Sequence, residues 1–483
     1  MRFLSAVAFA FVLILVSCAC KKSTKKTETP AVITPPITTP VTSDVSFWLT
    51  KGDKSVLLQK QNVALNFSST NNSNTTIEVD ANQVYQTIDG FGYTLTGGSA
   101  TLMNSLGATE KDALIKELFS TEEGAIGVSY LRVSIGASDL SANVFTYNER
   151  PAGQTDVNQD NFSIAAEMTD LVPILKKILA INPNIKILGS PWTAPTWMKT
   201  NNAYKGGSLK PEYYQSYAKY FVKYIQAMKA QGITIDAITI QNEPLHPGNT
   251  PSMYMEAPDQ AIFIKSALGP AFQAAGLSTK IIVYDHNADK PEYPMTILAD
   301  PAANQYVDGS AFHLYGGNIS ALSTVHDTYP NKNVYFTEQW VGGPGNFAAD
   351  LKWHVSTLIV GATRNWSRNV LEWNLAADAN YNPHTPDGGC TTCLGAITIA
   401  PAVTRNVAYY VIAHASKFVR PGSARIGSTL NSTLSNVAFK TPDGKKALIV
   451  MNTSSTDQTF NIKDNGKIVT TTLPAGAAGT FVW

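Results

Sequence analysis

The sequence predicts an α/β protein in which a closed (β/α)8 barrel of the TIM type carries a flanking β-sandwich built from both chain ends. From about residue 85 onward, eight apolar β-type segments alternate with longer helical stretches, the pattern of a parallel barrel. Short strands and turns follow Lys417, and similar segments precede residue 85. The chain has 483 residues, of which 44% are hydrophobic, enough for one large domain and an appendage.

Residues 1–18 are typical of a signal for export. One arginine precedes an apolar run too short for a confident membrane span, and the run ends in LVSC, which resembles a bacterial lipobox. Cys18 would then be acylated and become the first residue of the mature chain. An ordinary signal peptide is the alternative, and Cys20 is a weaker lipidation candidate. We therefore expect an exported bacterial lipoprotein whose lipid anchor attaches it to a membrane, at the outer membrane, the cell surface or the periplasmic face.

Residues 19–44 form the next segment, which is basic at first and then rich in Thr and Pro. This composition predicts a linker that holds the folded part away from the membrane. Residues 45–84 contain VALNFS and TTIEVD, which have strand character and should supply the N-terminal strands of the sandwich.

The (β/α)8 barrel is expected over residues 85–416. Its predicted strands are TIDGFGYTL, SYLRVSIG, IKILGSPW, AITIQNEP, KIIVYDHN, VDGSAFHLY, NVYFTEQW and NVLEWNLA. The stretch PEYYQSYAKYFVKYIQAMKAQG predicts a helix between two of them, because its apolar residues recur at three and four and it ends at Gly232.

Residues 417–483 predict the C-terminal part of the β-sandwich. Asp443 and Gly444 in KTPDGKKA are a hairpin signal between two apolar segments, and TFNIKD and GTFVW follow. This all-β segment is small for a free-standing sandwich, so we expect it to pair with residues 45–84.

Charge and cysteine content exclude several classes of function. The formal net charge is +1 and no basic stripe interleaves with aromatics, so nothing indicates nucleic acid and a neutral substrate is expected. The seven histidines show no metal-binding spacing, so we expect no metal and no cofactor. Cys390 and Cys393 form an isolated CxxC, which is weak evidence for zinc and, in an exported protein, favours a small disulfide.

Two glutamates stand at the C-terminal ends of predicted strands, where TIM barrels carry their active sites. Glu243 in QNEP ends the fourth strand, and Glu338 in FTEQ ends the seventh. Glycoside hydrolysis needs two such carboxyl groups, one to protonate the leaving oxygen and one to attack the anomeric carbon or activate water. A structural salt bridge is the alternative for either residue.

Aromatic side chains crowd the same strand ends, where sugar rings could stack on them. They are Trp192, Trp197, Tyr315, Trp340 and Trp373. Any one of them could instead belong to the core, but their shared placement favours a carbohydrate cleft.

Polar residues near these strand ends have plausible supporting roles. An arginine inside a barrel needs an anionic partner, and Glu338 could be the partner of Arg132. Asn242 could bind a sugar 2-hydroxyl. Asp139 leaves the second strand, and His313 could be a donor behind the reacting groups or an ordinary buried polar residue.

With these residues identified, the chain resembles glycoside hydrolase family 30, which includes lysosomal glucosylceramidases and bacterial and fungal β-1,6-glucanases. The motifs IDGFG, SPWTAPTWMKTN, GSLKPEYYQSYAKYFVKY, QNEP, FHLY, FTEQ and EWNLA match in order over roughly residues 85–483. The resemblance implies the fold described above and a retaining double displacement.

The resemblance also implies a role for each matching residue. Glu243 would be the acid/base and Glu338 the nucleophile. The residues expected to bind the sugar before the cleaved bond are Asp139, Trp192, Trp373 and, at the 2-hydroxyl, Asn242. Those expected to support the nucleophile are Arg132, His313 and Tyr315. The acid at Asp139 favours glucose over xylose.

The stretches GYTLTGGSA, FHLYGG, FTEQW and GGCTTCLG are similar to the β-1,6-glucanase branch. Glucosylceramidases typically differ near Gly97, at Leu314 and at the position of Trp340. We therefore expect a β-glucan substrate and an endo-β-1,6-glucanase with a bell-shaped pH profile on the acidic side of neutral. The alternatives are a β-glucosidase or glucosylceramidase and, from another class, a non-catalytic surface glycan-binding lipoprotein. The oligomeric state is open.

Overall fold

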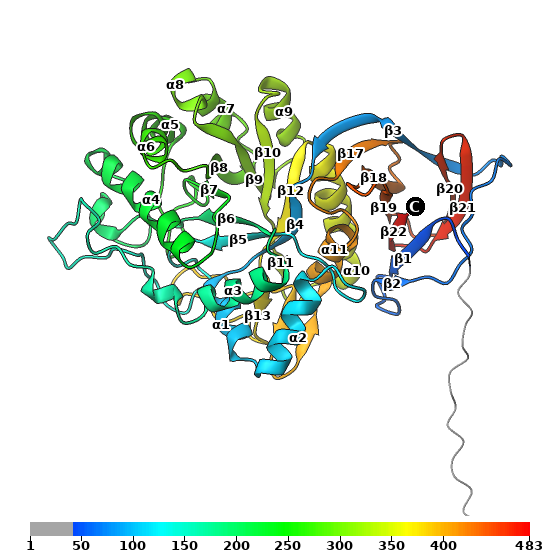
Figure 1. Cartoon of the computed structure of the whole chain (residues 1–483), viewed down its shortest axis with the longest axis horizontal. Helices are drawn as coiled ribbons and strands as arrows, with labels where there is room; N and C mark the ends of the chain where they lie inside the picture. The colour runs from blue at the N-terminus through cyan, green and yellow to red at the C-terminus, as the bar shows by residue number, and fades with distance from the viewer. Residues whose placement is uncertain (1–41) are drawn as a thin grey trace, which may run out of the picture. The chain divides into compact units, whose positions relative to one another are not determined.

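A computed structural model of the protein describes residues 42–483, so the predicted signal sequence, Cys18 and nearly all of the predicted linker lie outside the described residues. Eight parallel strands close into a barrel, which confirms the predicted fold class (Figure 1). In order around the barrel they are β10 (Asn333–Glu338), β12 (Ser367–Glu372), β4 (Gly90–Thr94), β5 (Tyr130–Ser134), β6 (Lys186–Ser190), β7 (Ala237–Thr239), β8 (Lys280–Ala288) and β9 (Val307–Gly317).

The inside of the barrel is filled in layers, because alternate residues of each strand point inward. One apolar layer consists of Tyr130, Leu188, Ala237, Ile282, Ala311, Tyr335 and Leu371. Two residues further along six of these seven strands stand Arg132, Ser190, Thr239, His313, Thr337 and Trp373. The layer nearer the mouth is therefore mostly polar, and this change of chemistry marks where the core ends and the site begins.

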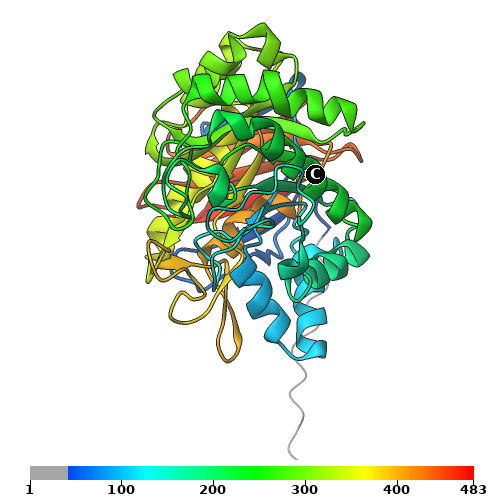
Figure 2. The same cartoon turned by 90° about the vertical axis from the view of Figure 1, so that its left-hand side faces the viewer.

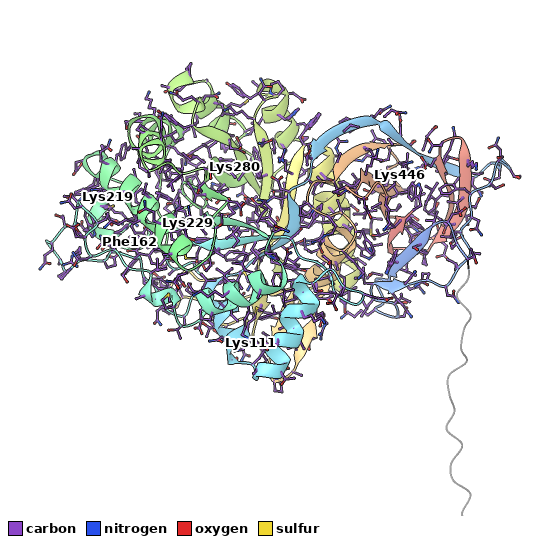
Figure 3. All side chains as sticks on the ribbon, viewed as in Figure 1. Lys111, Phe162, Lys219, Lys229, Lys280 and Lys446 are labelled. Carbon is purple, nitrogen blue, oxygen red and sulfur yellow. A yellow bond between two sulfur atoms is a disulfide. The ribbon has the colours of Figure 1, made fainter. Side chains whose placement is uncertain are left out.

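Helices surround the barrel in both views (Figures 1 and 2). They are α1 (Gly97–Ser105), α2 (Ala108–Phe119), α3 (Leu171–Ile181), α4 (Tyr214–Ala230), α5 (Ala257–Phe263), α6 (Gly269–Ala274), α7 (Glu292–Leu298), α8 (Pro301–Asn304), α9 (Ala321–Thr328), α10 (Phe347–His354) and α11 (Val407–Ser416), with π-helical turns η4 (Ile264–Leu268) and η5 (Val355–Ala362). Helix α4 is the one predicted from its periodicity. Its buried face carries Tyr217, Phe221 and Tyr224, while Lys219 and Lys229 lie on its outer face (Figure 3).

Blue N-terminal strands and red C-terminal strands lie side by side in Figure 1, in one nine-stranded sheet. Its order is β2 (Gln59–Lys60), β1 (Ser46–Thr50), β22 (Ala478–Val482), β19 (Lys446–Asn452), β18 (Leu434–Lys440), β17 (Ala424–Ser428), β3 (Thr75–Thr87), β20 (Gln458–Asp464) and β21 (Lys467–Leu473). The rings of Phe460 in β20 and Phe481 in β22 are 5.9 Å apart although several strands separate them in the sheet. The sheet therefore folds over its own core as a sandwich.

Two details of the sandwich differ from the sequence-based expectation. Strand β3 extends to Thr87, past the expected boundary at 84, because it pairs with Ala424 there. The segment VALNFS forms no strand, and only Ser68 bridges to Ile468. Its Leu65 is instead tied by the hydroxyl of Ser43, so its apolar residues pack without a ladder.

Short strands on the mouth side of the barrel shape the site. Strand β11 (Val341–Gly342) pairs with β14 (Cys393–Leu394), and β13 (Ala376–Ala377), β15 (Ile397–Ile399) and β16 (Val403–Arg405) form a second small sheet. They hold the segment after β12 against the segment after β10. In residues 42–483 no helix is long and apolar enough to cross a membrane.

Candidate active site

Glu243 and Glu338 face each other across the barrel mouth, as predicted. Glu338 ends β10, and Glu243 follows β7 in a left-handed conformation with φ of 46°, held by a bond from its N–H to the carbonyl of Asp285. A non-glycine residue there costs about 1–3 kcal/mol, which is common where a side chain must be aimed at a reaction centre. One oxygen of each carboxylate lies within 4.8 Å of the other, the short separation found in retaining glycosidases.

Asp285 is the hub of the polar layer beneath the two glutamates. It is fully buried and accepts hydrogen bonds from Ser190, Thr239 and Thr337 at 2.6–2.7 Å. Although burial opposes ionisation, the charge of Arg132 and the bond from His313 hold the pKa of Asp285 well below its usual range. Asp285 is therefore a fixed negative charge.

Arg132 links this hub to Glu338. Its guanidinium donates to Glu338 Oε2 at 2.5 Å, to Asp285 Oδ2 at 2.9 Å and to Asn242 Oδ1 at 2.6 Å. The hydroxyl of Tyr315 donates to the other oxygen of Glu338 at 3.0 Å. Burial raises the pKa of Glu338, and the charges of His313 and Arg132 oppose that rise. The pairing of Arg132 with Glu338 expected from the sequence is present.

His313 lies beside Glu243 rather than Glu338. Its Nδ1 is 3.0 Å from Glu243 Oε1 and its Nε2 is 3.1 Å from Asp285 Oδ1, whereas Glu338 Oε1 is 3.9 Å away. Burial disfavours the charged ring, but the charge of Glu338 and the bonds to Asp285 and Glu243 raise the pKa of His313 to about 9. Burial alone would raise the pKa of Glu243, but the bond from His313 lowers it. His313 and Glu243 therefore share one proton, held on the imidazole in the resting site.

A cavity of about 460 Å³ opens above these groups. It is lined by Asp139, Trp192, Asn242, Glu243, His246, Asn249, His286, Asn287, Tyr315, Glu338, Trp340, Trp373 and residues 388–393. Since Glu243 follows β7 and Glu338 ends β10, they divide the mouth into two arcs. Four strands lie between them on one side (β12, β4, β5 and β6) and two on the other (β8 and β9).

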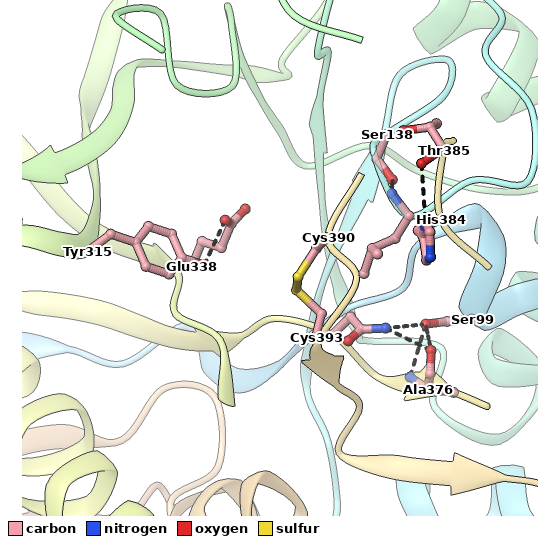
Figure 4. The surroundings of a disulfide bond; sticks show 11 residues. Ser99, Ser138, Tyr315, Glu338, Ala376, His384, Thr385, Cys390 and Cys393 are labelled. Carbon is pink, nitrogen blue, oxygen red and sulfur yellow. Dashed lines mark hydrogen bonds between the residues drawn. A yellow bond between two sulfur atoms is a disulfide. The ribbon is translucent and has the colours of Figure 1, made fainter. Parts of the chain in front are cut away.

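The larger side carries Asp139, Trp192, Trp373 and the segment 388–393, which we call the aromatic arc. The two indole rings are 5.5 Å apart, and both are almost fully buried. The Cys390–Cys393 disulfide packs with them and forms part of the wall, on the side of the cavity that faces Tyr315 and Glu338 (Figure 4). Burial and the charges of Glu338 and Glu243 raise the pKa of Asp139 to about 7.

The smaller side carries His286 and Asn287 at the end of β8, Tyr315 at the end of β9, and His246 and Asn249 in the loop after Glu243. We call these five residues the histidine arc. It presents imidazole, amide and phenol groups and contains no tryptophan. The two arcs therefore meet at the two carboxylates with different chemistry.

The structure brings together most of the site residues expected from the sequence. Trp340 lines the cavity next to Trp373, and the amide oxygen of Asn242 is taken by Arg132, which leaves its NH2 group for a ligand. Trp197 does not line the cavity, because its indole donates to the carbonyl of Asn148 and packs edge-on against Tyr213. It belongs to the core.

Sequence reasoning missed Asp285 and His286. Both lie in YDHN, at the end of a strand that was correctly recognised. The rule that selected Glu243 and Glu338, a polar group at the C-terminal end of a barrel strand, would have selected these two residues as well.

One group of the described residues could hold a metal by distance, namely Glu243, His313 and Glu338, whose donor atoms lie within 4.8 Å of one another. Both ring nitrogens of His313 already face carboxylate oxygens, and Glu338 faces Arg132. A cation there would compete with these bonds, so the donor set fits proton transfer better than metal binding.

A TIM barrel whose mouth carries two carboxylates at the separation found in retaining glycosidases, with tryptophans around them, has the architecture of a glycoside hydrolase. Comparisons with known proteins agree. Residues 88–419 match the glycosyl hydrolase family 30 TIM-barrel domain, and residues 422–481 match the family's β-sandwich domain. The chain belongs to glycosyl hydrolase family 30.

Relatives and solved structures refine the comparison. An endo-1,6-β-D-glucanase of Aspergillus fumigatus is 38% identical over 399 residues, which cover 77% of this chain and 80% of the relative. The lysosomal acid glucosylceramidase of Mus musculus is 28% identical over 435 residues, 83% of this chain and 81% of the relative. The solved structure of an endo-β-1,6-glucanase has a TM-score of 0.84 and 37% identity, covering 92% of this chain and 99% of that one.

Proposed function

We propose that this protein is an endo-β-1,6-glucanase that cleaves β-1,6-linked glucan by double displacement. The proposal rests on one observation. The carboxylates of Glu243 and Glu338 lie at the short separation found in retaining glycosidases, beside a cavity lined by tryptophans. The linkage is supported by relatives named endo-1,6-β-D-glucanases, which are 35–38% identical over most of the chain.

In the first step, a glucose unit lies against the aromatic arc and the Glu338 carboxylate attacks its anomeric carbon. The bond from that carbon to the leaving oxygen breaks, and the proton shared by His313 and Glu243 passes through Glu243 to the oxygen. Arg132 and Tyr315 hold Glu338 in place, while Asp285 holds Arg132 and His313.

In the second step, water attacks the same carbon and gives its proton to Glu243. The ester bond to Glu338 breaks, Glu338 regains its negative charge, and the β-configuration is restored. The free NH2 group of Asn242 faces the cavity where the 2-hydroxyl of the bound sugar would lie, and its oxygen is fixed by Arg132. This bond is of the kind that strengthens in the transition state.

A time course with linear β-1,6-glucan tests the proposal. Short oligosaccharides that appear before glucose, with β-anomers released first in the NMR spectrum, are expected. Release of glucose alone, on short glucosides or glucosylceramide, would favour the β-glucosidase or glucosylceramidase alternative. Binding without turnover would favour a glycan-binding lipoprotein.

We also propose that the enzyme is exported and anchored in a bacterial membrane through acylated Cys18. The support is the LVSC motif followed by a Thr- and Pro-rich segment of linker composition. Metabolic labelling with a fatty-acid analogue should mark the full chain, and Cys18→Ala should abolish the label and release the protein from membranes. Label retained in Cys18→Ala would contradict the assignment.

A further inference from the structure

His286 is a buried side chain of the cavity that the two-step chemistry does not use. It lies in β8 with 7% of its surface exposed and lines the cavity on the histidine arc. Its ring centre is 6.4 Å from that of His313, so it stands one strand away from the residue that shares a proton with Glu243.

The hydrogen bonding of His286 fixes which nitrogen carries its proton. The backbone N–H of Leu245, two residues after Glu243, donates to His286 Nδ1 at 3.4 Å. Burial lowers the pKa of His286 to about 4, so the ring is neutral at ordinary pH. A neutral imidazole that accepts at Nδ1 must carry its hydrogen at Nε2. This Nε2–H has no partner among residues 42–483, and it is not sealed from solvent.

Asn287 provides a second oriented donor next to it. Its side-chain oxygen accepts the N–H of Tyr315 at 2.9 Å, and its carbonyl accepts the hydroxyl of Tyr284 at 2.6 Å. These bonds fix the residue from both ends and leave its NH2 group without a partner in the described part of the chain. Asn287 also lines the cavity.

We propose that His286 and Asn287 form the subsite for the leaving sugar, donating from Nε2 and Nδ2 to the hydroxyls of a neutral hexose. The inference rests on the proposed function and adds to it which residues hold the group that departs. The aromatic arc is the side suited to stacking the attacked glucose, so the sugar beyond the cleaved bond must lie toward β8 and β9. Both donors are neutral, which suits an uncharged sugar.

The β-1,6 linkage explains why oriented donors are needed for the leaving sugar. In a β-1,6 bond the leaving oxygen is attached to an exocyclic CH2 group, so one more torsion separates the cleaved bond from the leaving ring. Glu243 can protonate that oxygen only when the torsion is held in one orientation. Two fixed donors restrict it, whereas an apolar stacking surface would let the ring slide.

A matched pair of variants tests the subsite. His286→Leu keeps most of the bulk and removes the donor, and His286→Gln keeps a donor of similar reach. On a β-1,6-linked glucotriose we expect His286→Leu to lower kcat/KM by about 10-fold and His286→Gln by less than about 3-fold. On 4-nitrophenyl β-D-glucoside, whose leaving group has no hydroxyls, both variants should stay within about 3-fold of the unmodified protein.

Transglycosylation gives an independent readout, because the acceptor sugar must occupy the same subsite. With the aryl glucoside as donor and a β-1,6-linked glucose disaccharide as acceptor, His286→Leu should lower the ratio of transfer to hydrolysis by about 10-fold. If His286→Leu does not fold, as judged by its melting temperature, Asn287→Ala is measured in its place with the same expected selectivity.

Equal loss on both substrates, with displaced limits of the pH profile, would overturn the inference and place His286 in support of Glu243. Unchanged kinetics on both substrates would overturn it as well. Failure of the proposed function looks different, because the unmodified protein would then hydrolyse the aryl glucoside but not the β-1,6 trisaccharide. In that case the acceptor experiment with differently linked disaccharides still decides the role of His286.

Discussion

The two arcs of the cavity hold sugars by different means. The aromatic arc has two tilted indole rings 5.5 Å apart, an aspartate whose pKa is raised and a disulfide-closed segment, and the tryptophans pack with the cysteines in one cluster. In the histidine arc, the side chains of His286 and Asn287 are each held by one hydrogen bond from a backbone N–H. The attacked sugar must be held in one pose through both steps, whereas the leaving sugar must depart, and the difference in packing follows that division.

Substitution of Glu338, which stands between the two arcs, should produce the largest effect. Glu338→Gln removes the nucleophile on which both arcs depend, so kcat should fall by about 10⁴-fold or more on the aryl glucoside and on β-1,6 oligosaccharides alike. The melting temperature should change little. Glu212→Gln, at an exposed glutamate in the turn just before α4, is the matched control and should keep full activity. Near-normal activity of Glu338→Gln would remove its assigned role.

Asp285→Asn tests the buried negative charge beneath both arcs. It leaves Arg132 and His313 without their buried counter-charge, so we expect a loss of about 3 kcal/mol in the free energy of unfolding, measured with urea. Activity should fall on both substrate types, since the hub orients the groups on either side. A loss below about 1 kcal/mol would show that the charge is not needed there.

Trp373→Ala tests the aromatic arc, as the His286 variants test the histidine arc. It removes one of the two adjacent indole rings, and kcat/KM should fall by about 100-fold on both the aryl glucoside and the trisaccharide. Trp373→Phe should recover part of the loss. If Trp373→Ala instead spared the aryl glucoside, the attacked sugar would not lie on the aromatic arc.

The pH dependence of activity should be the smallest of the kinetic effects. The first step needs the proton shared by His313 and Glu243, so kcat/KM should fall above about pH 9, the pKa of His313. On the acid side it should fall when Glu338, whose pKa is raised, becomes protonated. This alkaline limit lies higher than the acid-side optimum expected from the sequence alone, and a profile that falls already between pH 6 and pH 7 would contradict it.

His313 also affects stability, and its contribution changes with pH in the opposite direction to that of a carboxylate with a lowered pKa. Its folded pKa is raised from 6.5 to about 9, so the stabilisation is complete below pH 6.5 and is lost as the pH rises to about 9. A shift of this size corresponds to about 3 kcal/mol. His313→Asn should flatten this part of the stability curve measured with urea.

Much of the fold was predictable because the barrel strands are buried, mostly apolar segments that end in recognisable polar groups. All eight strands were identified, as was the hairpin at Asp443 and Gly444. The segment VALNFS was predicted as a strand and does not form one. It has strand composition, but strand formation requires a partner edge, and its neighbours offer it only the Ser68 bridge and one bond from the N–H of Val45 to the carbonyl of Leu65.

The site was predictable where one residue type allows few roles, as for Glu243, Glu338 and the buried Arg132. The partner of His313 was not, because the left-handed turn at Glu243 brings that carboxylate toward β9, and sequence does not reveal the turn. Tyr315 of the histidine arc was identified from the sequence, and the strand-end rule would also have selected His286. Which nitrogens of His286 and Asn287 remain free as donors was not predictable, because only the backbone bonds to these two side chains show it.

The most direct test of the central claim, that Glu338 attacks a glucose held on the aromatic arc, is to trap the glycosyl-enzyme with 2-deoxy-2-fluoro-β-D-glucosyl fluoride. We expect a mass increase of one fluoroglucosyl unit, located by peptide mapping on Glu338 and absent from Glu338→Gln. No mass increase while the protein still hydrolyses β-glucosides, or a label on Glu243, would contradict it.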